Sequence, residues 1–181
     1  MNAKSDRRLV MAVIGAGSRL EPNVEQLCCA LGQQAIDAGF RIVTGGLGGV
    51  MAAVSKGART AARRREGDIV GVLPMYDAEL ANPYVDIVIP TGMGIARNVM
   101  VVASGDVVVA IGGGSGTLSE IALAWQLGKP LIALSPAGGW AQKLAGQRVD
   151  GRRDDPIFEA QTAEQAIEQA LAAVTHLSSR P

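Results

Sequence analysis

The chain has 181 residues, of which 48% are hydrophobic and only 3% aromatic, and 17 acidic residues balance 17 basic ones. This length predicts a single domain over residues 1–181, with flexible ends at 1–8 and 177–181. The balanced charge gives no overall field that favours nucleic acid or an anionic membrane, so neither is expected as a partner.

The N-terminal residues lack the apolar stretch and small-residue cleavage site of a signal peptide. The longest apolar segment, residues 99–111, is interrupted by Ser104-Gly105-Asp106 and is too short to span a bilayer. The two cysteines, Cys28 and Cys29, are adjacent and predict neither a disulfide framework nor a zinc site. We therefore expect a reduced, cytoplasmic protein.

Short β-branched runs alternate along the chain with segments of helical pattern. Their order predicts an α/β fold, a single doubly wound Rossmann-like domain with a mainly parallel sheet of about six to seven strands flanked by helices. A polar stretch over residues 145–156 is expected to form a surface loop. Strands are predicted at residues 9–14, 41–44, 69–73, 87–89, 106–111 and 131–134, and helices at 22–38, 50 to about 64, 95–104, from the turn at Gly112 to 127, and 162 to about 176.

Three glycine clusters follow predicted strands: Gly15-Ala16-Gly17-Ser18, Gly45 to Gly49, and Gly112 to Gly116. Ligands of such sheets bind beyond the carboxyl ends of the strands, so all three clusters are expected to face one crevice. The first cluster lacks the third glycine of a dinucleotide-binding fingerprint, because that position is Leu20. Gly128-Lys129 is followed by Pro130, which excludes a phosphate-binding Walker loop.

The turn from Gly112 to Thr117 lies between a buried strand and a helix start, and it carries the strongest signal for ligand binding. Its glycines allow successive N–H groups to point into one concavity, and the helix dipole adds partial positive charge there. Ser115 and Thr117 add hydroxyl donors. The turn therefore predicts a site for a phosphate or a similar anion.

Two charged residues near this turn are open to more than one interpretation. Glu120 fits a capping box with Thr117 and equally fits a carboxylate that reaches a bound sugar. Arg97 is expected in the first helical turn, where the macrodipole disfavours a cation unless a phosphate or carboxylate compensates it. Asn98 beside it adds an amide. Trp140 fits either a lid or a small satellite cluster.

Other chemistry has little support in the sequence. The single histidine, His176, lies near the C-terminus, so no Ser-His-Asp or Cys-His arrangement is predicted. No cluster of metal ligands is present, and no metal site is expected. The basic run Arg59 to Arg65 is interpreted as a solvated helix end, with a partner-binding patch as the alternative.

Three ordered motifs together resemble the LOG-like Rossmann (SLOG) superfamily, which includes the cytokinin-activating phosphoribohydrolases once called lysine decarboxylases. They are Thr44-Gly45-Gly46-Leu47-Gly48-Gly49-Val50-Met51, Gly94-Ile95-Ala96-Arg97-Asn98 and Gly113-Gly114-Ser115-Gly116-Thr117-Leu118-Ser119-Glu120. In the hydrolases, Pro stands where this chain has Gly112, Glu where it has Ser119, and Lys where it has Asn98. These departures make the chain similar to the branch that includes the molybdenum cofactor carrier proteins.

The resemblance implies a binding or carrier protein for a phosphorylated nucleotide or pterin, such as molybdenum cofactor, with no further cofactor required. The alternative is a hydrolase of the N-glycosidic bond of nucleoside 5′-monophosphates, with Arg97 and Glu120 as catalytic residues. A nucleotide sensor is a third option. Family members form homodimers or homotetramers. The residues expected to bind the ligand are Gly15, Gly17, Ser18, Gly45, Gly46, Gly48, Gly49, Met51, Thr91, Gly92, Arg97, Asn98, Gly112, Gly113, Gly114, Ser115, Gly116, Thr117 and Glu120.

Overall fold

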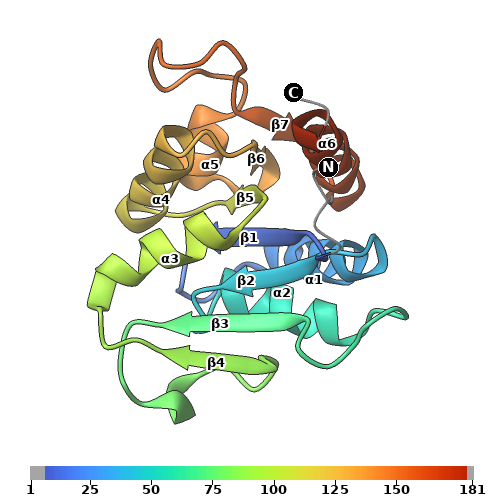
Figure 1. The fold of residues 1–181 in the computed structure, drawn as a ribbon, viewed down its shortest axis with the longest axis vertical. Coiled ribbons are helices and arrows are strands. Elements are labelled where there is room, and N and C mark those ends of the chain that lie inside the picture. The colour runs from blue at the N-terminus through green and yellow to red at the C-terminus, as the bar shows by residue number, and fades with distance from the viewer. Residues whose placement is uncertain (1–6, 179–181) are drawn as a thin grey trace, which may run out of the picture.

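The computed structural model describes the backbone of residues 7–178 and the side chains of residues 7–175, so most of the ends expected to be flexible lie outside the described residues. One seven-stranded sheet has the order β4-β3-β2-β1-β5-β6-β7, and all neighbouring strands are parallel (Figure 1). The strands are β1 (Val10–Gly15), β2 (Arg41–Thr44), β3 (Ile69–Leu73), β4 (Ile87–Pro90), β5 (Val107–Ile111), β6 (Leu131–Leu134) and β7 (Phe158–Ala160).

Helices cover both faces of this sheet, which confirms the predicted doubly wound α/β fold. One layer is formed by α1 (Pro22–Asp37), α2 (Val50–Arg59) and α6 (Ala163–Ser178). The other is formed by α3 (Arg97–Ser104), α4 (Ser115–Gln126) and α5 (Gly139–Leu144). Short 3-10 turns are η1 (Ala78–Leu80), η2 (Gly94–Ala96) and η3 (Ser135–Ala137).

Alternate side chains of the central strands divide between the two helical layers. Met11 and Val13 of β1 belong to the core beneath α1, α2 and α6, whereas Ala12 and Ile14 belong to the core beneath α3, α4 and α5. This alternation follows from the two-residue period of a strand. Because both faces are covered, β5 is buried at every position, as expected for a central parallel strand.

Two helical glycines bring α1 and α2 into backbone contact. A Cβ at Gly32 would come within 2.0 Å of the Val54 carbonyl oxygen, and one at Gly57 within 1.9 Å of the Cys29 carbonyl oxygen. Any larger side chain would force the two helices apart. This packing fixes α2, and with it the glycine loop that precedes α2.

The chain reverses its direction of winding between β1 and β5. It runs outward from β1 through β2 and β3 to β4, then returns to β5 and continues through β6 to β7 (Figure 1). Such a topological switch point leaves a crevice beyond the carboxyl ends of the two adjacent strands. The glycine clusters after β1 and β5 lie at this point.

The observed elements differ from the predicted ones in a few places. Helix α2 ends at Arg59 instead of about residue 64, because Thr60 forms its C-cap and its Oγ1 donates to the Gly57 carbonyl. The short β7 and the six-residue α5 have no counterpart in the predicted list. The predicted surface loop at residues 145–156 is confirmed and projects beyond α5 and β7 in Figure 1.

The basic run after α2 holds neighbouring acidic side chains at the amino edge of the sheet. Arg59 and Arg64 reach Asp86 Oδ1 at 3.3 and 2.5 Å, and Arg63 Nη1 donates to the Asp37 carbonyl at 3.0 Å. Only Arg59 lies at the end of α2; Arg63 and Arg64 lie beyond it and are held by Asp37 and Asp86, so the prediction of a solvated helix end is only partly right. Among residues 7–178, no helix combines the length and apolar character needed to cross a membrane.

Candidate functional site

A crevice of about 300 Å³ opens beyond the carboxyl ends of β1, β2 and β5, as the sheet topology predicts. Three glycine segments and the first turn of α3 meet there, although they are far apart in the sequence. The crevice is lined by Val13, Ile14, Gly15, Ala16, Gly17, Gly45, Leu47, Met51, Arg97, Asn98, Gly114, Gly116, Thr117 and Glu120.

The turn between β5 and α4 presents a run of free backbone donors. Within the described part of the chain, the amide N–H groups of residues 113 to 117 donate to no backbone or side-chain acceptor. Gly112 and Gly113 have φ values of +60° and +88°, which favour glycine, and the Thr117 side chain packs over Gly113. Free N–H groups at a helix N-terminus form an anion-binding concavity.

The capping-box interpretation of Glu120 is wrong. Helix α4 begins at Ser115 with Gly114 as its N-cap and no side-chain capping bond, so Thr117 is already in the helix. Glu120 is instead buried in the wall of the crevice, with 7% of its surface exposed. Burial raises the pKa of its carboxyl to about 7, and the positive charge of Arg97 opposes this rise.

Arg97 is the first residue of α3, and its guanidinium enters the crevice over the backbone of Gly45. Burial lowers its pKa, and Glu120 opposes the shift. Among residues 7–178, no carboxylate lies within 4.0 Å of its nitrogens and no acceptor takes a hydrogen bond from them. The described residues therefore supply no anion to compensate the charge of Arg97 at this helix N-terminus, and a bound ligand could supply it.

The crevice collects about half of the residues predicted to bind the ligand. Ten line it: Gly15, Gly17, Gly45, Met51, Arg97, Asn98, Gly114, Gly116, Thr117 and Glu120. Ser18, Gly112 and Gly113 line an adjoining cavity of about 190 Å³ on the other side of the β1–α1 loop. Gly46, Gly48, Gly49, Thr91, Gly92 and Ser115 do not line the crevice.

Several of these outlying residues have clear structural contacts. Thr91 donates its hydroxyl to the Leu73 carbonyl, and Gly92 is packed beneath the ring of Tyr76. Gly49 has a φ of +60° and lies against the β1–α1 loop, where a Cβ would come within 2.2 Å of the Ala16 carbonyl oxygen. These three residues therefore shape the loops around the crevice and do not face it.

The apolar wall of the crevice was not predicted. Ile14 and Leu47 line the crevice together with Met51, and all three are apolar. Ile14 was predicted only to lie in a strand, and Leu47 only to lie in a glycine-rich loop. The carboxyl-terminal position of Ile14 in β1 was the available signal, since side chains at strand ends line such crevices.

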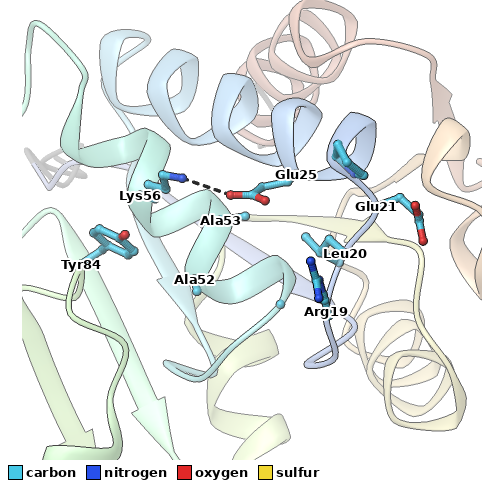
Figure 2. A pocket seen from close by; sticks show the side chains of 10 residues that line it. Arg19, Leu20, Glu21, Glu25, Ala52, Ala53, Lys56 and Tyr84 are labelled. Atoms are coloured by element: carbon cyan, nitrogen blue, oxygen red, sulfur yellow. Dashed lines mark hydrogen bonds and ion pairs between the residues drawn. The ribbon is translucent and has the colours of Figure 1, made fainter.

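A larger groove of about 830 Å³ lies beside α1 and α2 (Figure 2). Figure 2 shows Tyr84 and Lys56 on one side and Leu20 and Arg19 on the other, above small residues of α2. Lys56 is neutralised by Glu25 at 3.1 Å. The groove holds no buried unpaired charge within the described residues, so the smaller crevice is the better candidate site.

Comparisons with known proteins agree with this architecture. A molybdenum cofactor binding protein from Rippkaea orientalis is similar with a TM-score of 0.81 and 34% identity, over 94% of this chain and 99% of that one. A molybdenum cofactor carrier protein from Chlamydomonas reinhardtii has a TM-score of 0.75 and 30% identity, over 94% and 99% of the two chains.

A cytokinin riboside 5′-monophosphate phosphoribohydrolase from Mycobacterium marinum is 32% identical in an alignment 163 positions long, which covers 80% of this chain and 84% of that protein. The model of the SLOG cluster4 family matches residues 8–168, a range that includes all three glycine segments, Arg97 and Glu120. By this match, the chain belongs to the SLOG cluster4 family.

Proposed function

We propose that this chain binds a phosphorylated pterin or nucleotide in the crevice and acts as a carrier for molybdenum cofactor or a closely similar molecule. The observation that carries the proposal is the run of free amide N–H groups from Gly113 to Thr117 beside the unpaired guanidinium of Arg97. The relatives described as molybdenum cofactor binding and carrier proteins support the choice of ligand.

The lining residues suit such a ligand in three ways. The N–H groups of the turn and of the first turn of α4 donate to the phosphate, and Arg97 adds a full positive charge whose attraction to the phosphate is strengthened by the partly buried setting. Ile14, Leu47 and Met51 provide an apolar surface for a flat ring system. A volume of about 300 Å³ is at the lower end of the range for small-ligand sites.

Hydrolysis of a nucleoside 5′-monophosphate is the second candidate function. The crevice brings Arg97 and Glu120 together, and a carboxyl with a pKa of about 7 suits proton transfer near neutral pH. The similarity to the phosphoribohydrolase supports this alternative.

The carrier is favoured over the hydrolase because of the residue before Glu120. Ser119 stands where the hydrolases have a second glutamate, and its hydroxyl is exposed and donates to the Gly116 carbonyl of its own helix. Glu120 is then the one carboxylate among the residues that line the crevice. Glycoside hydrolysis ordinarily uses a pair of carboxylates.

The same proposal includes self-association in the cytoplasm as a homodimer or homotetramer. A continuous stretch of the chain, from Tyr76 to Met100, supplies eight large hydrophobic residues that are exposed in the single chain: Tyr76, Leu80, Ile87, Ile89, Met93, Ile95, Val99 and Met100. We call this surface the β4–α3 face. Exposed large hydrophobic residues gathered in one part of a soluble protein are typical of an interaction site.

The test is an anaerobic titration of the purified protein with molybdenum cofactor, together with incubation with a panel of nucleoside 5′-monophosphates at high protein concentration. The proposal predicts saturable binding of one cofactor per chain, protection of the cofactor from oxidation, and no release of free base. Release of base and ribose 5-phosphate from a monophosphate would favour the hydrolase. Absence of cofactor binding would overturn the carrier.

A further inference from the structure

The carbonyl groups of the glycine turn are held by the first amides of α5. Trp140 N donates to the Gly113 carbonyl and Ala141 N donates to the Gly112 carbonyl, each at 3.1 Å. The turn is therefore fixed by a segment about 25 residues further along the chain, which does not itself line the crevice.

These two hydrogen bonds determine the direction of the turn's donors. A trans peptide places its C=O and its N–H on opposite sides, and residues 7–178 contain no cis peptide bond. Because the carbonyls of Gly112 and Gly113 point to α5, the N–H groups of Gly113 and Gly114 point away from α5. Gly114 lines the crevice, and its N–H, which points away from α5, belongs to the run of free donors proposed to bind the anion.

The approach of the two segments depends on Gly139. A Cβ there would come within 2.5 Å of the Gly112 carbonyl carbon and 2.7 Å of the Gly113 nitrogen. Its neighbour Gly138 has a similar φ, +71° against +61°, yet a Cβ at Gly138 would meet nothing within 4 Å. The two glycines share the same backbone requirement, and Gly139 alone carries the contact.

We propose that Gly139, Trp140 and Ala141 are positioning residues for the anion site. The amides of Trp140 and Ala141 donate to both carbonyls of the turn, and Gly139 allows the close approach. Together they hold the amides of the turn in the orientation that binds phosphate. Trp140 serves this role through its backbone, while its side chain packs against the core beneath α3, α4 and α5. This inference rests on the proposed anion-binding function of residues 113–117.

The test compares Gly139→Ala with Gly138→Ala, using inorganic phosphate as the probe and the backbone amide NMR signals of residues 113–117 as the readout. Both substitutions place alanine at a positive φ, and only the one at Gly139 also meets the turn, so their difference reports the close approach. Gly139→Ala should weaken phosphate binding at least tenfold relative to Gly138→Ala, with amide signals of distant strands unchanged. Binding within twofold of Gly138→Ala would overturn the inference and leave the proposed function intact.

A measurement on the unaltered protein covers the case in which Gly139→Ala does not fold. If phosphate requires the turn to be held, phosphate must in turn stabilise the two hydrogen bonds to α5. Saturating phosphate should slow hydrogen exchange at the Trp140 and Ala141 amides at least tenfold, an effect that a purely structural contact would not produce. Unchanged exchange, with the turn amides still shifted by phosphate, contradicts the inference. If phosphate shifts no turn amide at all, the proposed anion site fails and the inference fails with it.

Discussion

The guanidinium of Arg97 lies on the backbone of Gly45, where a Cβ would come within 1.8 Å of the Arg97 Nη1 atom. The contact joins the end of β2 to the start of α3, a helix that packs over β1, β2 and β3. Only a residue without a side chain at position 45 leaves room for the arginine in the crevice. The first and second sequence motifs thus depend on one another sterically.

Gly45→Ala should therefore displace Arg97 without altering it. Gly45 does not have a positive φ, so alanine fits its backbone, and stability should change by less than about 0.5 kcal/mol. Loss of a charge-assisted contact should weaken binding of a phosphorylated ligand about tenfold or more. Calorimetric titration of Gly45→Ala, Arg97→Ala and the double variant checks this. A double variant much weaker than Arg97→Ala would show that Gly45 acts by another route.

Glu120 should make the protein less stable as the pH rises. Burial raises the pKa of its carboxyl from an ordinary value near 4.5 to about 7, so the folded state binds the proton more tightly than the unfolded state. Its contribution is fully present below pH 4.5 and is lost as the pH rises to about 7.

Glu120→Gln removes this dependence. The free energy of unfolding of the variant should exceed that of the parent at pH 8 by up to about 3 kcal/mol, and the difference should shrink towards pH 5. Urea denaturation at both pH values measures it, and taking the difference between the two proteins cancels other titrating carboxyls. An equal difference at the two pH values would contradict the assigned pKa.

The β4–α3 face should be the surface through which copies of the chain associate. Ile95, 89% exposed, is the most exposed large hydrophobic residue among those described. Ile95→Asp should convert the oligomer to a monomer in multi-angle light scattering, because burying an unpaired carboxylate is costly. Leu171→Asp, on α6 and 40% exposed, is the matched control and should leave the oligomer intact. If light scattering finds that the unaltered protein is a monomer, the proposed self-association is contradicted.

The close approach of α1 and α2 should depend on Gly57. Gly57→Ala gains about 1 kcal/mol of helix propensity, but its methyl group overlaps the Cys29 carbonyl at 1.9 Å. Forced separation of the helices should produce a net destabilisation of about 2 kcal/mol. Gly151→Ala, in an exposed loop with open space around it, should be nearly neutral in the same thermal unfolding experiment. If Gly57→Ala and Gly151→Ala unfold at the same temperature, the close contact between α1 and α2 is contradicted.

Much of the fold follows from local pattern. The buried run Val107–Ile111 and the glycine clusters after β1, β2 and β5 are enough to predict a doubly wound sheet and a crevice at the carboxyl ends of its strands. The missed elements, β7 and α5, are three and six residues long. Segments this short have little periodicity, and their structure depends on tertiary hydrogen bonds such as those from α5 to Gly112 and Gly113.

The chemistry of the candidate site stays a prediction from the sequence, and its geometry could be predicted only in part. The types of residue at Arg97 and Gly114 to Thr117 indicated an anion site, and the structure brings them together. The spacing of Thr117 and Glu120 matched a capping box by coincidence, because Gly114 ends the turn three residues earlier. The contact between Arg97 and Gly45 joins two residues about 50 positions apart in the chain, so it has no local signal in the sequence.

The most direct test of the account is native mass spectrometry of the protein produced in cells that make molybdenum cofactor. The proposal predicts one phosphorylated pterin per chain in the unaltered protein and its loss in Arg97→Ala, with the fold of the variant intact by circular dichroism. A protein that retains no pterin and instead cleaves nucleoside 5′-monophosphates to free base would contradict the carrier function.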